Sequence, residues 1–329
     1  MPYVSFGLLV YNGADFLTEA IESILAQTFE DFELIISDNA STDGTDAICK
    51  EYATKDQRIR YYRNERNMGS AWNYNRVFEL SSGRYFKWAS HDDLIAPDFL
   101  IKCVEVLDQD PGVVLCHSKT RIVDERGNPL LDVEFNLNTD SPKPAIRCRD
   151  LVGAHLCFQI FGLIRSSTLR KTSLMGNYGH ADGILLLRLG LLGRFHEIPG
   201  YLFFFRHFPQ QSTSLYFPHF LAFAAGNPEY STDTIPDYHQ WAVFFDPAKD
   251  GKVVFPHWRI LREVRKSITA SPINWGEKIR CFRSMRKQAK NEERSLFRKL
   301  LIKDLIVASR TILTHLKRRE PNRKSTGSD

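Results

Sequence analysis

The sequence has few cysteines, and none of them has the spacing of a structural motif. Its 329 residues contain six cysteines, with no Cys-x-x-Cys pair and no Cys/His cluster at zinc-finger spacing. This pattern argues against a disulfide scaffold and against a structural zinc site. We therefore expect the protein to reside in a reducing compartment.

Long apolar runs and glycine-rich phosphate loops are also missing. No run of about 18 apolar residues occurs, so no transmembrane helix is expected. The apolar stretch 3–11 lacks the basic and hydrophobic regions of a signal peptide and is typical of a first strand. The turn after it has one glycine, Gly13, instead of a dinucleotide-binding fingerprint, and no Walker lysine loop is found. These absences predict a cytoplasmic protein that is neither a dinucleotide-binding oxidoreductase nor a Walker-type nucleotide-binding protein.

Charge is distributed unevenly along the chain. The net charge of +5 combines 16 Lys/Arg and 5 Asp/Glu in residues 278–329 (+11) with 28 and 34 in residues 1–277 (−6). Hydrophobic residues at 43% and charged residues at 25% are typical of a globular protein, and the length suits about two domains. The chain is therefore an acidic globular body with a basic C-terminal tail.

Strand and helix patterns alternate through the first 120 residues. Strands are expected at 4–10, 32–36, 59–62, 85–89 and 113–116. The helices between them begin at Asp15 as N-cap, at Asp43, at Ala71 and at Pro97. This βαβ succession predicts an α/β fold whose mostly parallel sheet carries helices on both faces.

The pattern changes after residue 120. We expect a hairpin at 121–131, a polar loop at 136–144, a leucine-rich helix at 182–192 and a strand at 201–205. Residues 218–256 have no assignable pattern, and basic helical segments follow residue 258.

Polar residues gather where the expected parallel strands end. Asn12 follows the first strand, Asp38-Asn39 the second and Asp92-Asp93 the fourth, and ligands of open α/β sheets bind at this edge. The carboxylate pair suits Mg²⁺ or Mn²⁺ holding a diphosphate. The alternative is that Asp93 or Asp98 caps the next helix and that Asp38 forms a turn.

Taken together, these segments resemble family 2 inverting glycosyltransferases. The matching segments occur in that family's order over roughly residues 1–110: Met1-Pro2-Tyr3-Val4-Ser5 through Tyr11-Asn12, Ile24-Leu25-Ala26-Gln27-Thr28-Phe29, Phe32-Glu33-Leu34, Asp38-Asn39-Ala40-Ser41-Thr42-Asp43-Gly44-Thr45, Asn67-Met68-Gly69, Asn75, Gly83-Arg84-Tyr85 and the carboxylates after Trp88. Beyond them, scattered matches continue to about Ser212.

The resemblance implies a GT-A fold with a division of labour along the chain. Residues 1–118 would form the nucleotide-sugar-binding α/β half, and 119–217 the acceptor-binding half of the same domain. Residues 218–329 would form a basic, mainly helical C-terminal extension.

The resemblance also implies which residues bind the donor. Those on the nucleotide would be Tyr11, Asp38, Asn39, Asn67, Gly69 and Asp92, and those on the metal Asp93, Asp92 and His207. Many family members have Asp in place of Asn39, where it reads the uracil imide; an amide both donates and accepts, so a UDP-sugar remains the favoured donor. The family's DxD element here reads Ser90-His91-Asp92-Asp93, with one acidic residue fewer.

An inverting transfer needs a general base for the acceptor hydroxyl. By resemblance, Asp182 in Tyr178-Gly179-His180-Ala181-Asp182-Gly183 is the candidate catalytic base, with His180 where the family usually has Glu. The alternative is that Asp182 only caps the leucine-rich helix.

These expectations describe an Mn²⁺- or Mg²⁺-dependent transferase of cell-surface polysaccharide synthesis that moves a sugar from a nucleotide to a glycan or lipid-linked acceptor. One alternative is a sugar-phosphate nucleotidylyltransferase, although the Gly-rich basic loop that it needs is missing. The other is a catalytically silent nucleotide- or carbohydrate-binding module.

The tail adds a question of location. Apolar residues recur at helical spacing among its basic residues: Leu296, Phe297, Leu300, Leu301, Leu305, Ile312, Leu313 and Leu316. Such a helix suits an anionic membrane surface on the inner face of the cell membrane. The alternative is packing on the body or on a second copy in a homodimer. No nucleic-acid partner is expected, because the tail lacks a binding motif and an aromatic platform.

Overall fold

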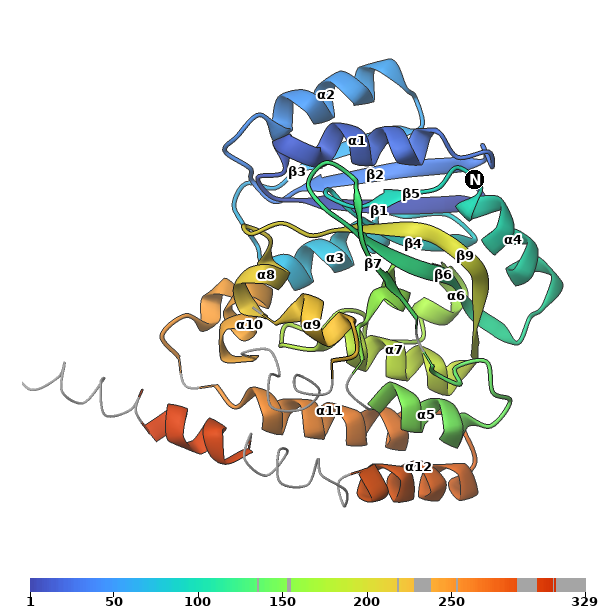
Figure 1. Ribbon diagram of the computed structural model, residues 1–329, viewed down its shortest axis with the longest axis vertical. Coiled ribbons are helices and arrows are strands. Elements are labelled where there is room, and N and C mark those ends of the chain that lie inside the picture. Colours follow the sequence, from blue (N-terminus) through green and yellow to red (C-terminus); the bar gives the residue numbers. More distant parts are fainter. Residues whose placement is uncertain are drawn as a thin grey trace, which may run out of the picture.

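The structure is a computed structural model that describes residues 1–134, 136–152, 155–217, 219–227, 238–252, 254–288, 301–309 and 311. Within these residues, nine strands form one curved sheet in the order β3-β2-β1-β4-β8-β6-β9-β5, with β7 paired to β6 (Figure 1). The strands are β1 (Val4–Val10), β2 (Phe32–Asp38), β3 (Ile59–Arg63), β4 (Tyr85–Ser90), β5 (Leu94–Ile95), β6 (Val113–Val123), β7 (Pro129–Val133), β8 (Leu163–Arg165) and β9 (Arg194–Arg206).

Most of this sheet is parallel, as the alternating pattern predicts. β1 pairs in parallel with β2 and β4, β2 with β3, and β6 with β9. The short β8 lies antiparallel between β4 and β6, and it therefore joins the two parallel blocks. β5 and β7 are the other antiparallel strands, and β7 closes the expected hairpin with β6.

Helices cover both faces of the sheet. One face packs on α1 (Ala14–Leu25), α2 (Thr45–Lys55) and α4 (Phe99–Gln109), and the other on α3 (Ser70–Glu79) and α7 (Ala181–Leu192). Beyond α7 lie α5 (Pro144–Val152), α11 (Pro256–Ala270) and α12 (Trp275–Gln288), which form a further layer (Figure 1). Other helices of the described residues are α6 (Ser166–Leu169), α8 (Ser212–Tyr216), α9 (Phe220–Ala224), α10 (Tyr238–Phe245), η1 (Phe158–Phe161) and η3 (Pro247–Lys249).

Alternation along the strands supplies the two cores. Phe6 and Leu8 of β1 face α1 and α4, whereas Phe86 and Trp88 of β4 face α3 and α7, and all four are fully buried. Every residue of β2 is buried, which is typical of a parallel strand covered on both faces.

The helix starts differ from the sequence prediction by one or two residues, and α3, predicted from Ala71, begins at Ser70. α1 has Gly13 as its N-cap, and Asp15 lies inside the first turn. α2 begins after Gly44, because the Asp43 carboxylate is used to accept the backbone N–H groups of Ala14 and Thr45. α4 begins at Phe99, so Pro97 lies before the helix and Asp98 at its N-cap. The N-cap of α7 is His180, so Asp182 is not the cap residue.

The C-terminal extension folds back onto the body. α11 and α12 follow the aromatic segment, and residues 301–309 are again helical. Of the predicted tail stripe, Leu296, Phe297, Leu300, Ile312, Leu313 and Leu316 lie outside the described residues. Across the described residues, no helix is both long and apolar enough to cross a membrane.

Asp304 attaches the last described helix to the body. Its buried Oδ2 accepts the backbone N–H groups of His257 and Trp258 at the start of α11, and its Oδ1 lies 2.6 Å from His257 Nδ1 and 3.2 Å from His239 Nε2. Burial opposes ionisation of this carboxyl, but the hydrogen bonds from both histidines lower its pKa to about 2.

We expect Asp304→Ala to lower the free energy of unfolding by about 3 kcal/mol, because it leaves buried donors without an acceptor. A depressed pKa means that this contribution is present above the ordinary Asp value of about 4 and is lost as the pH falls toward 2. Denaturant unfolding between pH 7 and pH 2 measures it. The exposed Asp250→Ala is the matched control, and equal stability of the two variants at pH 7 would contradict the assignment.

Candidate functional site

Strand register brings the predicted site together at one edge of the sheet. Val10 at the end of β1 is paired with Asp38 at the end of β2, and Leu9 is paired with Ser90 at the end of β4. The loops that follow these strands line a cavity of about 710 Å³, the size of a small-molecule site. Six of the predicted residues line it: Tyr11, Asn39, Asn67, Asp92, Asp93 and Asp182.

Asp38, Gly69 and His207 are not among the lining residues. Asp38 is fully buried below the cavity, where its Oδ1 accepts the Ser41 N–H at 2.8 Å and its Oδ2 accepts the Tyr61 hydroxyl at 3.0 Å. Arg63 lies beside it, 4.0 Å from Oδ2. Its oxygens are therefore used to shape the β2–α2 loop.

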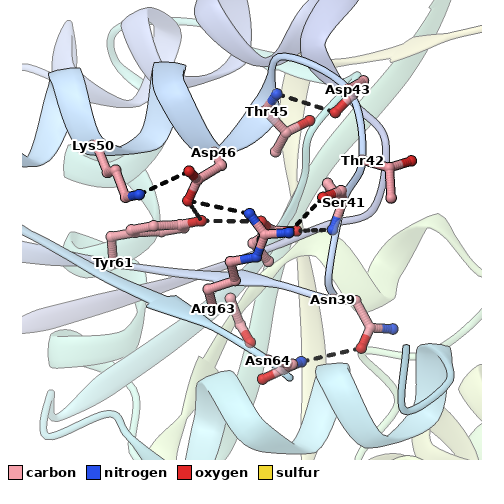
Figure 2. A network of polar contacts seen from close by, with 12 residues as sticks. Asn39, Ser41, Thr42, Asp43, Thr45, Asp46, Lys50, Tyr61, Arg63 and Asn64 are labelled. Atoms are coloured by element: carbon pink, nitrogen blue, oxygen red, sulfur yellow. Dashed lines mark hydrogen bonds and ion pairs between the residues drawn. The ribbon is translucent and has the colours of Figure 1, made fainter. Parts of the chain in front are cut away.

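The same loop is braced by a wider polar network (Figure 2). Tyr61 also lies 2.8 Å from Asp46 Oδ1, and Arg63 donates to the Ser41 carbonyl at 2.8 Å. Burial, followed by the bond to Asp46, raises the pKa of the Tyr61 hydroxyl, so it remains a donor. Because these contacts connect β2, β3 and α2, the loop is held in one conformation.

An asparagine network holds the neighbouring wall of the cavity. Asn39 donates through Nδ2 to Asn67 Oδ1 at 2.8 Å, and its Oδ1 accepts from Met68 N and Asn64 Nδ2. Gly69 has φ +87°, and a Cβ there would come within 2.7 Å of Pro247 Cδ, so glycine allows the close approach of this C-terminal segment. Tyr11 also lines the cavity, with 46% of its surface exposed.

The two carboxylates after β4 have different environments. Asp92 accepts Gln211 Nε2 at 3.0 Å through Oδ2, and Ser90 Oγ through Oδ1. Asp93 Oδ1 accepts the backbone N–H of Arg206 at 3.0 Å, whereas the buried Oδ2 has no hydrogen-bond partner among the described residues. Burial, and next the Asp92 charge, raise the pKa of Asp93 well above its usual range.

Two buried cations lie behind this pair. Arg206 is fully buried and donates to the Asp92 carbonyl at 3.0 Å, to Glu19 at 2.5 Å and to the Glu125 carbonyl. Lys87 is also buried; it donates to the Phe161 and Trp88 carbonyls, and burial lowers its pKa to about 8.

These donors fit a hard divalent cation. Asp93 Oδ2 is a buried oxygen that lacks a partner, it lines the cavity, and Asp92 lies next to it. Oxygen-only donors with one or two carboxylates are what Mg²⁺ and Mn²⁺ prefer. His207 is placed differently: its ring stacks on Phe220, with centroids 5.5 Å apart, and Nδ1 lies 3.4 Å from Ser214 Oγ.

A second group of side chains lines the same cavity near the start of α7. Asp182 Oδ1 accepts the N–H of Gly183 at 2.8 Å and lies 4.0 Å from His180 Nδ1. Cys157 is close to both, with all three potential ligand atoms within 4.8 Å of one another. About a third of the Asp182 side chain is exposed, so the carboxylate is accessible from the cavity.

Sequence reasoning missed several of these residues. Gln211 and Cys157 had no motif around them, and Lys87 is part of an apolar strand. Arg206 precedes His207 in the segment assigned to the metal, but it is the Arg206 backbone and guanidinium that contact the Asp92-Asp93 turn. An arginine directly after the apolar run 201–205 was the available signal.

Known proteins resemble this chain in sequence. The sequence model of glycosyl transferase family 2 matches residues 5–172, about half of the chain. Uncharacterized glycosyltransferases of Rickettsia typhi and Methanocaldococcus jannaschii are 34% and 35% identical over 40% and 39% of this chain. These alignments span less than half of the relatives, 41% and 45% of their lengths. A Haemophilus influenzae relative is 26% identical over 65% of this chain and 68% of its own length.

Solved structures extend the likeness to the fold. TarS 1–349 of S. aureus, in complex with UDP-GlcNAc, has a TM-score of 0.63 at 14% identity and covers 93% of this chain and 80% of its own. A mannosyltransferase from Pyrobaculum calidifontis, in complex with GDP-Man and Mn²⁺, has a TM-score of 0.51 at 15% identity, covering 97% and 88%. The expected GT-A fold is therefore confirmed.

The environment of Asp93 leads to a stability prediction. We expect Asp93→Asn to raise the free energy of unfolding of the metal-free protein by about 1–2 kcal/mol, because an amide has no charge to desolvate. A raised pKa means that the wild type loses stability as the pH rises from about 4, and this loss should be absent in the variant. Thermal unfolding in a chelator measures both effects.

Asp98→Asn is the matched control, since that carboxylate is 41% exposed and paired only with Lys102. The prediction is wrong if Asp93→Asn is less stable than this control at pH 7.

Proposed function

Because the chain belongs to glycosyl transferase family 2, we propose that it transfers a sugar from a nucleoside diphosphate to a hydroxyl of a glycan or lipid-linked acceptor, with inversion. One observation carries this proposal: a single cavity is lined both by the Asp92-Asp93 pair and by Asp182. Diphosphate departure and hydroxyl attack occur on opposite sides of the sugar carbon, so they need two separate charged groups in one site.

We place the donor nucleotide along the loops after β1 and β2. The half-exposed Tyr11 offers an aromatic face to a base, and the Asn39–Asn67 pair forms the adjoining polar wall. The solved neighbours were crystallised with UDP-GlcNAc and GDP-Man, which supports a nucleotide-sugar donor. UDP is our proposed nucleotide, since Asn39 Nδ2 donates one of its two N–H groups to Asn67 and can donate the other to a uracil carbonyl.

We assign Asp93, with Asp92, to hold Mn²⁺ or Mg²⁺. The unpartnered Oδ2 of Asp93 supports this assignment, and Mn²⁺ was present in the mannosyltransferase neighbour. When bound, such a cation supplies positive charge for the leaving diphosphate. Gln211 and Ser90 orient Asp92, and Arg206 fixes the turn through the Asp93 carboxylate and the Asp92 carbonyl.

Asp182 is our proposed general base, and it would take the proton of the acceptor hydroxyl at a carboxylate oxygen. Its place in the first turn of α7 exposes the carboxylate to the cavity, while the Gly183 N–H fixes Oδ1. In this proposal, residues 1–118 supply the donor side of the site and residues 119–217 the acceptor side. Both halves belong to one sheet, because β6 (Val113–Val123) runs across the boundary between them.

The C-terminal extension suggests where such an acceptor is met. On the helix 301–309, Ile302, Leu305 and Ile306 are each about half exposed and share one face. An apolar face on a basic tail suits an anionic membrane, so we propose peripheral attachment at the cytoplasmic face during cell-surface polysaccharide synthesis.

A panel of UDP- and GDP-sugars, assayed for nucleoside diphosphate release with Mn²⁺ and with EDTA, tests the activity. We expect slow Mn²⁺-dependent release from one donor without an acceptor. Formation of a nucleotide-sugar from a nucleoside triphosphate and a sugar phosphate would instead indicate a nucleotidylyltransferase. Donor binding without any release, with every acceptor tried, would indicate a silent binding module.

The base assignment has its own test. Asp182→Asn keeps an oxygen for the Gly183 N–H but cannot take a proton, so we expect kcat to fall by about 10²–10⁴ with donor affinity and melting temperature unchanged. Single-turnover rates and donor titration calorimetry measure this. Asp98→Asn, a carboxylate at a helix start outside the cavity, is the control, and unchanged turnover in Asp182→Asn places the base elsewhere.

A further inference from the structure

The side chains around Asp182 have the composition of a metal site. The proposed reaction uses Asp182 as a base but has no role for a metal ion bound there. The Cys157 thiol, the His180 imidazole and the Asp182 carboxylate each have a ligand atom within 4.8 Å of the others. All three side chains line the cavity and are partly exposed, so an ion in solution can reach them.

The histidine of this group is held in place at a cost in backbone energy. His180 has φ +62°, a left-handed conformation that costs a non-glycine residue about 1–3 kcal/mol. Its ring lies over Gly183, where a Cβ would come within 2.2 Å of the imidazole, and it packs against His155 and Tyr238 at 6.4 and 6.0 Å. The imidazole is therefore positioned before any ion arrives.

The donor atoms select a different metal from the one expected at Asp92-Asp93. Sulfur, nitrogen and one carboxylate oxygen suit Zn²⁺, with three protein ligands and a fourth position open to the cavity. The oxygen-only Asp92-Asp93 pair suits Mn²⁺ or Mg²⁺. Ligand chemistry thus separates two kinds of metal within one cavity.

We propose that Cys157, His180 and Asp182 bind one Zn²⁺ ion, which occupies the carboxylate of the proposed base and switches transfer off. Binding forms Zn–S, Zn–N and Zn–O bonds and releases the thiol proton to solvent, with no change of oxidation state. Binding stands on the geometry alone, whereas the switch rests on the proposed function of Asp182.

The protonation states of the free site agree with this exchange. Burial raises the pKa of the Cys157 thiol, and the Asp182 charge raises it further, so each ion displaces a proton. Burial lowers the pKa of His180, which keeps the imidazole in the neutral form that ligates metals.

Cobalt binding to the metal-free full-length protein tests the site without turnover. Co²⁺ bound through a thiolate gives an ultraviolet charge-transfer band and the visible bands of a tetrahedral ion, and we expect Zn²⁺ to erase both at one equivalent while excess Mn²⁺ does not. Cys157→Ser should lose the charge-transfer band. Cys103→Ser should keep it, since that buried thiol is not in the Cys157 group and donates to the Cys116 carbonyl, which a hydroxyl can also do.

Absence of the band in the wild type, or its persistence in Cys157→Ser, overturns the site. The switch is tested separately, by adding Zn²⁺ to enzyme saturated with Mn²⁺ and donor. We expect the transfer rate to fall by about 100-fold, which is the typical contribution of a general base. The rate of each variant in Zn²⁺ is compared with its own rate without Zn²⁺. The zinc-dependent fall should be lost in Cys157→Ser and kept in Cys103→Ser.

If the cobalt band depends on Cys157 but the enzyme keeps full activity in Zn²⁺, the metal site stands and the proposed switch is overturned. That result would also count against Asp182 as the general base. If no donor is turned over, the proposed function fails, and the cobalt experiment still decides the site.

Discussion

The buried guanidinium of Arg206 is the contact on which the site depends. It ends β9 and joins three separate parts of the chain: the Asp92 carbonyl in the β4–β5 turn, Glu19 and the Phe16 ring (at 4.6 Å) on α1, and the Glu125 carbonyl at the β6–β7 turn. A guanidinium can do this because its donors point in several directions in one plane and keep their charge when buried. The acidic turn is therefore held by a cation from the second half of the fold.

This arrangement explains why two acidic residues can be adjacent in a buried turn. Among the residues that the structure describes, Asp92 is hydrogen-bonded through both oxygens, whereas Asp93 accepts only a backbone N–H, so the electrostatic cost of the pair falls on Asp93. Lys87 is close enough to favour ionisation of Asp93, but it makes its hydrogen bonds to carbonyls. Stability and cation binding thus make opposite demands on one side chain.

The parallel half of the fold could be predicted from sequence because its signals are local. Apolar runs such as 4–10 and 32–36 mark buried strands, and the polar residues after them mark the ligand edge. β8 could not be predicted in this way: three residues at 163–165 form a strand because they fill a gap between β4 and β6. The helix starts differed by one or two residues. At α2, for example, Asp43 lies before the helix because its carboxylate accepts the N–H groups of Ala14 in α1 and Thr45 in α2.

The site could be predicted in part for the same reason. Motif residues that follow strands, such as Tyr11 and Asp92, line the cavity, whereas Asp38 is turned inward by Tyr61 and Ser41, contacts that no spacing reveals. Among the site's neighbours, Gly69 has a consequence for reading natural variation. Pro247 and the Phe245 carbonyl lie where its side chain would be. Any larger residue at this position would therefore push the segment 245–247 away from the asparagine network. A variant at position 69 would look like a donor-binding defect in an assay, although the residue itself does not line the cavity.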